Sequence, residues 1–113
     1  MTALEFIDEY IRPDIGDTLQ PYQWNGSVIL ERINAGQREI AKRKPAALYV
    51  GSEIVIDIPA DLATTAAALW IAAEFHEALR FYVDAALLAE DKESDTRAAE
   101  ATQYLSRYER DLA

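Results

Sequence analysis

The side chains that could do chemistry are few in this chain, and their spacing matches no known reactive site. His76 is the only histidine, and the chain contains no cysteine. An imidazole has an ordinary pKa near neutrality, but the acids beside it, Glu74 and Glu77, stand at offsets that do not share its face of a helix. Zinc proteases need a second histidine on that face, which is missing here. We therefore interpret His76 as a structural residue.

Serine and carboxylate chemistry finds no better support. The sequence has no Gly-x-Ser-x-Gly nucleophile elbow, no phosphate-binding glycine-rich loop and no calcium loop with spaced aspartates. Adjacent acids, such as Asp8 with Glu9 or Glu90 with Asp91, are expected on solvated helix faces and helix ends. We predict a protein that is not an enzyme and that uses no cofactor and no metal ion.

Composition argues against a multidomain protein, a duplex nucleic-acid binder and a membrane protein. A chain of 113 residues, half of them apolar, can bury one modest core, so we expect a single domain over 1–113. Its formal net charge of −9 argues against binding to duplex nucleic acid, which requires an excess of Lys and Arg. The longest apolar-rich run, 62–73, is shorter than the ~20 residues of a membrane span, and the N-terminus lacks the features of a secretory signal. We expect a soluble protein without a membrane partner.

The elements that position these residues can be predicted from capping signals and periodicity. A capping box at Thr2 and Glu5 predicts a first helix over 3–11, which Pro13 ends. The segment that follows carries too many apolar side chains for a linker. We expect it to be an ordered loop anchored by Trp24.

A second helix is predicted over 28–43. The residues Asn25-Gly26-Ser27 supply a turn and an N-cap, and apolar residues recur after them at helical spacing. Gly36, in the middle of this helix, costs about 1 kcal/mol relative to alanine. That cost predicts that another backbone passes close to Gly36, in the same chain or in a neighbouring one.

The middle of the chain reads less clearly. Alternation over 47–58 predicts a β-hairpin with its turn at Gly51-Ser52. Over 61–71 the alanine content favours helix, whereas Leu69-Trp70-Ile71 also fits a short strand or an extended lead into a helix that starts near residue 72. Both interpretations of 61–71 stay open, with helix preferred.

Two more helices, over 72–90 and 95–111, are expected to pair as an antiparallel hairpin. The last helix should turn these residues inward: Ala98, Ala101, Leu105, Tyr108 and Leu112. The predicted fold is therefore mainly α with a small β-hairpin (α+β), a bundle of about four helices.

Charged and aromatic residues point to contacts with other molecules. The acids gather in the first 20 residues and over 84–100, and the only basic concentration consists of Arg38, Lys42, Arg43 and Lys44. This asymmetry permits head-to-tail pairing between copies, although cations near a helix C-terminus also follow from the helix dipole alone. The rings of Trp24, Phe81 and Tyr104 fit either an interface or half-buried packing.

Several of these residues recur in one order. A Trp at a helix start, Trp24, is followed by Asn34, Gln37, Glu39 and Ile40; much later come Phe75-His76-Glu77-Ala78-Leu79 with Tyr82 and Asp91, then an Ala/Tyr-rich last helix over 98–112. Over roughly 24–112 the chain thus resembles the small head-tail connector proteins, also called adaptor or head completion proteins, of tailed bacteriophages. Many relatives have extra strands in the middle, where this chain has only residues 48–71.

The resemblance implies a structural virion protein at the phage head–tail interface, present in the host cytoplasm during assembly. Such proteins form a ring, usually of twelve copies, below the portal. The implied partners are the portal protein, a tail or stopper protein and further copies of the chain. DNA would pass through an acidic channel without specific binding, because acids in a lumen repel phosphates.

Candidate contact residues follow from this interpretation. For portal docking we expect the C-terminal segment and the loop anchor: Arg107, Tyr108, Arg110, Asp111, Leu112, Ala113 and Trp24. For contacts between subunits we expect Arg38, Lys42, Arg43 and Phe81, and for the channel Glu53 and Asp57. The alternative is a small acidic regulatory or inhibitory protein that binds a basic protein partner through its acidic clusters.

Overall fold

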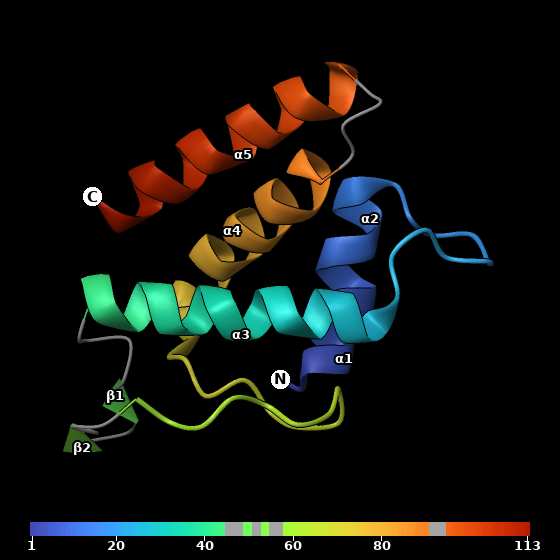
Figure 1. Ribbon diagram of the computed structural model, residues 1–113. Helices are drawn as coiled ribbons and strands as arrows, with labels where there is room; N and C mark the ends of the chain where they lie inside the picture. The colour runs from blue at the N-terminus through green and yellow to red at the C-terminus, as the bar shows by residue number, and fades with distance from the viewer. Residues whose placement is uncertain (45–48, 51–52, 55–57, 91–94) are drawn as a thin grey trace.

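The computed structural model describes residues 1–44, 49–50, 53–54, 58–90 and 95–113, and over these residues the chain is mainly helical, as predicted. Four helical segments make up most of it (Figure 1). The first joins α1 (Ala3–Phe6), the π-helical η1 (Ile7–Ile11) and α2 (Arg12–Ile15); the others are α3 (Gly26–Arg43), α4 (His76–Ala89) and α5 (Asp95–Leu112). The last two form the expected antiparallel pair, and α5 packs mainly along α4.

The first helix continues to Ile15, because Pro13 does not end it as predicted. The wide turn of η1 precedes the proline: the Arg12 N–H donates to the carbonyl of Ile7, five residues back. Pro13 is the second residue of α2 and follows this wide turn directly, so the change in hydrogen-bond spacing falls where the proline has no N–H to donate. The helix ends at Gly16, whose φ of 72° is a conformation that glycine adopts without strain. The predicted capping box at the start of this helix is present.

Helix α3 begins at Gly26, with Asn25 as its N-cap, two residues earlier than predicted. Its buried side carries Gly36 against α4. A Cβ at this position would lie 2.7 Å from both Leu79 Cδ1 and Tyr82 Cδ1. The neighbours that this glycine admits are therefore side chains of α4 in the same chain, not a passing backbone.

Two short strands follow α3. β1 (Tyr49–Val50) and β2 (Glu53–Ile54) pair antiparallel, with Tyr49 opposite Ile54 and Val50 opposite Glu53. The rest of the predicted hairpin lies outside the described residues. The hairpin over 47–58 as a whole therefore stays a prediction.

Residues 58–72 do not form the helix that their alanine content favours. They run as bends and turns beside the N-terminus, with an isolated bridge between Thr2 and Ala68. The Ala3 N–H donates to the Ala67 carbonyl and the Leu69 N–H to the Met1 carbonyl, both at 2.9 Å. These backbone groups are bonded to the N-terminal segment and are not available for a helix of their own.

Two buried side chains of α3 hold the same segment from the other side. The Asn34 amide donates to the Leu62 carbonyl at 3.1 Å and accepts from the Leu62 N–H at 2.8 Å. Gln37 Oε1 accepts from the N–H groups of Trp70 and Ile71 at 3.0 and 3.2 Å. After this segment a 3-10 turn, η3 (Ala73–Phe75), leads into α4, so the α-helix predicted from residue 72 begins at residue 76.

Candidate docking surfaces

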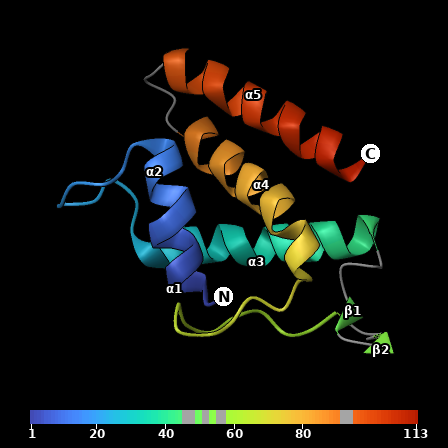
Figure 2. The same ribbon diagram turned by 180° about the vertical axis from the view of Figure 1, so that it is seen from behind.

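The loop between α2 and α3, residues 16–25, projects from the helical body in both ribbon views (Figures 1 and 2). We call it the projecting loop. Leu19 and Tyr22 are 82% and 41% exposed, whereas Trp24 is 7% exposed and belongs to the core. The expectation of a loop anchored by Trp24 is confirmed. Leu19, the most exposed apolar residue of the loop, lies outside the core of its own chain.

A buried ion pair fixes the base of the projecting loop. Arg12 Nη1 donates to Asp17 Oδ2 at 2.7 Å and to the Trp24 carbonyl at 3.1 Å. Asp17 also accepts from the N–H groups of Gln23 and Trp24, at 2.7 and 3.1 Å. Charge-assisted bonds of this kind are stronger than neutral ones. They hold the two ends of the loop together, and the Arg12 guanidinium lies 3.7 Å from the ring centroid of Tyr22.

Helix α5 supports the second half of the same loop. The Arg97 guanidinium lies 4.9 Å from the ring of Trp24, and its Nη1 donates to Gln23 Oε1 at 2.7 Å. Sequence reasoning found Trp24 but missed Arg12 and Asp17. The sequence did contain one sign of this ion pair. An arginine and an aspartate flank Gly16, in a segment whose apolar content already argues against a linker.

A second apolar surface lies between α4 and α5. It is a groove of about 390 Å³ lined by Tyr82, Ala85, Ala86, Ala89, Ala98, Ala101, Thr102 and Leu105. We call it the α4–α5 groove. The expectation that Ala98 and Leu105 face the core is wrong: Ala98 is exposed and Leu105 is 49% exposed. The apolar face of α5 is wider than the strip that α4 covers, and the alanines on both helices leave the space between them unfilled.

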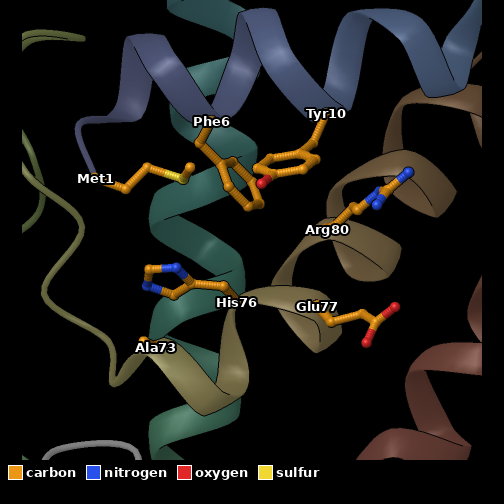
Figure 3. A pocket seen from close by; sticks show the side chains of 7 residues that line it. All are labelled: Met1, Phe6, Tyr10, Ala73, His76, Glu77 and Arg80. Carbon is orange, nitrogen blue, oxygen red and sulfur yellow. The ribbon is translucent and has the colours of Figure 1, made fainter.

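His76 lies in a cleft of about 350 Å³ between the first helix and the start of α4 (Figure 3). Its ring meets Phe6 edge to face, with centroids 6.3 Å apart, and its Nε2 lies 3.2 Å from the Ile71 carbonyl. Burial lowers the pKa of His76, so the neutral ring predominates at pH 7 and, when protonated on Nε2, donates to that carbonyl. These contacts agree with a structural role.

A buried charge cluster joins α2 to α4 at the edge of this cleft. Arg80 donates from Nε and Nη2 to the two oxygens of Asp14, at 2.5 and 2.6 Å. Asp84 is fully buried, and burial, with Asp14 beside it, raises the pKa of Asp84 to about 10. No donor group in the described part of the chain reaches an Asp84 oxygen. Protonated in this way, the neutral carboxyl of Asp84 can donate a hydrogen bond to the ionised Asp14.

The same cluster keeps Asp14 ionised. Burial opposes its charge, but the hydrogen bonds from Arg80 and Asp84 outweigh burial and lower the pKa of Asp14. With one carboxyl neutral and the other paired to Arg80, the cluster carries no uncompensated charge. We assign it to the packing of α2 on α4.

The residues predicted for portal docking fall into two groups. Arg107, Arg110 and Asp111 are exposed on the last turns of α5, and Ala113 is exposed directly after the helix. By contrast, Tyr108 and Leu112 are each 2% exposed and, like Trp24, pack in the core. In this conformation only the first group presents side chains to a partner. The three buried side chains serve the fold because they supply the apolar contacts of α5 and of the loop.

The residues predicted for subunit contacts are mostly paired within the chain. Arg38 bonds to Asp61, and Arg43 makes a two-pronged bond to Glu109 at 3.1 and 2.8 Å. Lys42 is exposed, and Phe81 is half-buried and stacked on a ring of α5. Of the residues predicted for the channel, Glu53 is described only in its backbone pairing, and Asp57 lies outside the described residues.

Within the described ranges no cluster of His, Asp or Glu is arranged to hold a metal ion. No helix among the same residues is long and apolar enough to span a bilayer. Comparison of the chain with known protein families, with curated proteins and with solved structures finds no match.

Proposed function

We propose that this chain is an assembly subunit of a tailed-bacteriophage head–tail junction. It forms a ring with copies of itself, docks on the portal protein, receives the tail or stopper protein, and lets DNA pass through an acidic channel. The observation that carries this proposal is the projecting loop, in which an exposed Leu19 is held away from the body by the buried pair of Arg12 and Asp17. A pre-ordered apolar projection binds a partner without the cost of ordering a flexible segment.

The residues on which the connector resemblance rests stabilise the fold of the chain. Trp24 anchors the projecting loop, Asn34 and Gln37 fasten residues 62–71, and His76 joins the first helix to α4. Their observed contacts are packing and backbone hydrogen bonds, and this includes His76, which lines the cleft beside the first helix. Such a pattern favours a structural part over an enzyme.

The charge distribution supports a channel that does not bind DNA. Five arginines are engaged with acids of the same chain: Arg12, Arg32, Arg38, Arg43 and Arg80. With a net charge of −9 the remaining surface is predominantly acidic. A ring of such subunits repels the phosphate backbone, so duplex DNA can slide without being held.

The test is to mix the purified chain with the portal protein of the genome that carries it. We expect a complex in sedimentation velocity and an added ring on portal particles in negative-stain images. Arg107→Glu with Arg110→Glu should weaken docking. This pair of substitutions is preferable to truncation after Ser106, which would also remove the buried Tyr108 and Leu112. A chain that ignores the portal, or that is absent from purified virions, contradicts the proposal.

The acid excess also suits the second candidate, a regulatory protein that binds a basic partner. That interaction would be governed by exposed charges and should weaken steeply as salt is raised. A monomer with no affinity for the portal and with salt-sensitive binding to a basic protein would favour this candidate. Docking on the portal that persists in salt would favour the connector.

A further inference from the structure

We propose that neighbouring copies of this chain join by inserting Leu19 of one projecting loop into the α4–α5 groove of the next copy. The inference rests on the proposed ring and names the contact that builds it. Leu19 is 82% exposed, and Leu105 at the groove is 49% exposed. Each surface is therefore apolar and accessible, and the described part of the chain does not cover it.

Because neither surface carries charged side chains, these two surfaces are suited to self-association. Copies with a net charge of −9 repel one another, so a stable contact must keep acids apart. The loop residues 18–23, Thr-Leu-Gln-Pro-Tyr-Gln, include no charged side chain. The residues that line the groove are alanines with one Tyr, one Thr and one Leu, and none is charged. The loop and the groove can thus meet without bringing carboxylates together.

The dimensions of the groove suit this occupant. A cavity of roughly 150 Å³ holds a benzene-sized group, so a groove of about 390 Å³ can take Leu19 and part of a neighbouring residue such as Tyr22. The loop enters in an ordered state, because Arg12, Asp17 and Trp24 fix its base. Little conformational freedom is lost when it docks.

The position of the two surfaces determines the kind of assembly. The loop leaves the body between α2 and α3 (Figure 1). The groove is lined by residues of α4 and α5. Because they are different surfaces of one chain, each copy donates a loop to one neighbour and receives a loop from the other. This contact is heterologous, and heterologous contacts close into rings when the rotation between copies permits.

Cross-linking tests the contact directly, since the natural chain has no cysteine. A Leu19→Cys chain and an Ala98→Cys chain, mixed in equal amounts and oxidised mildly, should form a mixed disulfide dimer. The matched control is Ala99→Cys, because Ala99 is exposed on α5 next to Ala98 but does not line the groove. Equal cross-linking to positions 98 and 99, or a preference of Ala98→Cys for itself, overturns the proposal.

Complementation tests the direction of the contact. Leu19→Asp and Ala98→Glu should each weaken self-association by on the order of tenfold or more, as expected when a buried leucine contact is lost. Mixed together, the two variants should form one-to-one dimers and nothing larger, because only one intact loop and one intact groove remain between them. Leu4→Asp and Ala99→Glu are controls on exposed sites outside both surfaces. They should associate like the natural chain, and circular dichroism should report folded helices throughout.

The portal experiment separates this proposal from the proposed function. If Leu19→Asp still forms rings on the portal, the loop-to-groove contact is wrong while the connector function stands. If the natural chain associates through loop and groove but ignores the portal, the contact is right and the connector function is wrong. A natural chain that stays monomeric up to about 1 mM and gives no mixed cross-link overturns the contact outright.

Discussion

Arg12 and Asp17 form a salt bridge of 2.7 Å in which each residue is only 6% exposed. The bridge closes around Gly16, where the chain turns out of the first helix. Burying two charges is costly unless their remaining groups are also bonded. Here Asp17 accepts two backbone N–H groups and Arg12 donates to a carbonyl, although Arg12 Nε has no hydrogen-bond partner among the described residues. The arrangement of the loop backbone and the ion pair therefore depend on each other.

Asp17→Ala should therefore destabilise the protein by about 3–5 kcal/mol, since it leaves the buried Arg12 charge with only the exposed Asp8, 3.8 Å away, as an acidic partner. Hydrogen exchange should accelerate at the amides of Gln23 and Trp24, which lose their acceptor. Urea unfolding and exchange mass spectrometry measure the two effects. Asp8→Ala is the control: this side chain is 56% exposed and lies 3.8 Å from Arg12, so its loss should cost no more than about 1 kcal/mol. Unchanged exchange at 23 and 24 would mean that Asp17 does not hold the loop.

Gly36→Ala should be destabilising even though alanine favours helix. The new methyl would lie 2.7 Å from Leu79 Cδ1 and from Tyr82 Cδ1, and the tyrosine ring is not the free end of a flexible chain. Overpacking of this kind costs about 1–3 kcal/mol, against a gain in helix propensity of about 1 kcal/mol. Thermal or urea unfolding gives the difference. Ala35→Gly, on the adjacent half-buried position, reports the propensity change by itself, and a Gly36→Ala chain more stable than the natural one would refute the close contact.

Asp84 should make the protein less stable as pH rises. In the unfolded chain its pKa is about 3.9, whereas in the folded chain it is raised to about 10. Between these values the folded state keeps a proton that the unfolded state releases, so the free energy of unfolding falls with increasing pH. Asp84→Asn cannot ionise and can still donate to Asp14. We expect it to be more stable than the natural chain by about 5 kcal/mol at pH 8, because the difference grows by about 1.4 kcal/mol for each pH unit above 4 and vanishes toward pH 4.

Urea midpoints measured from pH 4 to pH 9 test this expectation. Asp95→Asn, at an exposed position, is the matched control. Parallel stability curves for Asp84→Asn and the natural chain would show that Asp84 is ionised in the folded state.

Gln37→Leu should loosen the segment that crosses α3. The substitution keeps the buried volume roughly constant but leaves the N–H groups of Trp70 and Ile71 without their shared acceptor. Two unsatisfied donors at these positions cost about 2–6 kcal/mol together. Unfolding measurements and hydrogen exchange at 70 and 71 give the result, with Gln103→Leu on the exposed side of α5 as control. Equal stability of the two variants would place the acceptor elsewhere.

Local signals in the sequence predict most of the helices. The capping box at Thr2, the N-cap at Asn25 and the apolar periodicity of the last two helices identify segments that the structure contains. Pro13 misleads because a π-helical turn removes the conflict that a proline normally creates. Residues 61–71 mislead because their backbone is bonded by Asn34 and Gln37, which are remote in sequence.

The sequence predicts the candidate surfaces only in part. Periodicity identifies an apolar face on α5 but does not say how much of that face a neighbouring helix covers, so Ala98 and Leu105 were assigned to the core. The aromatic anchor of the loop was predictable from composition. The ion pair at its base was not predicted: Arg12 and Asp17 flank Gly16 in the sequence, but whether they pair depends on the geometry of a turn that no local pattern specifies.

The bridge between Thr2 and Ala68 has a consequence for biosynthesis. The opening helix leaves the ribosome long before the stretch that accepts its first N–H groups has been translated. Until then the apolar face of the first helix lacks most of the residues against which it packs in the folded protein. The first helix would therefore form most of its native contacts late in synthesis and at about the same time, once α4 has also emerged.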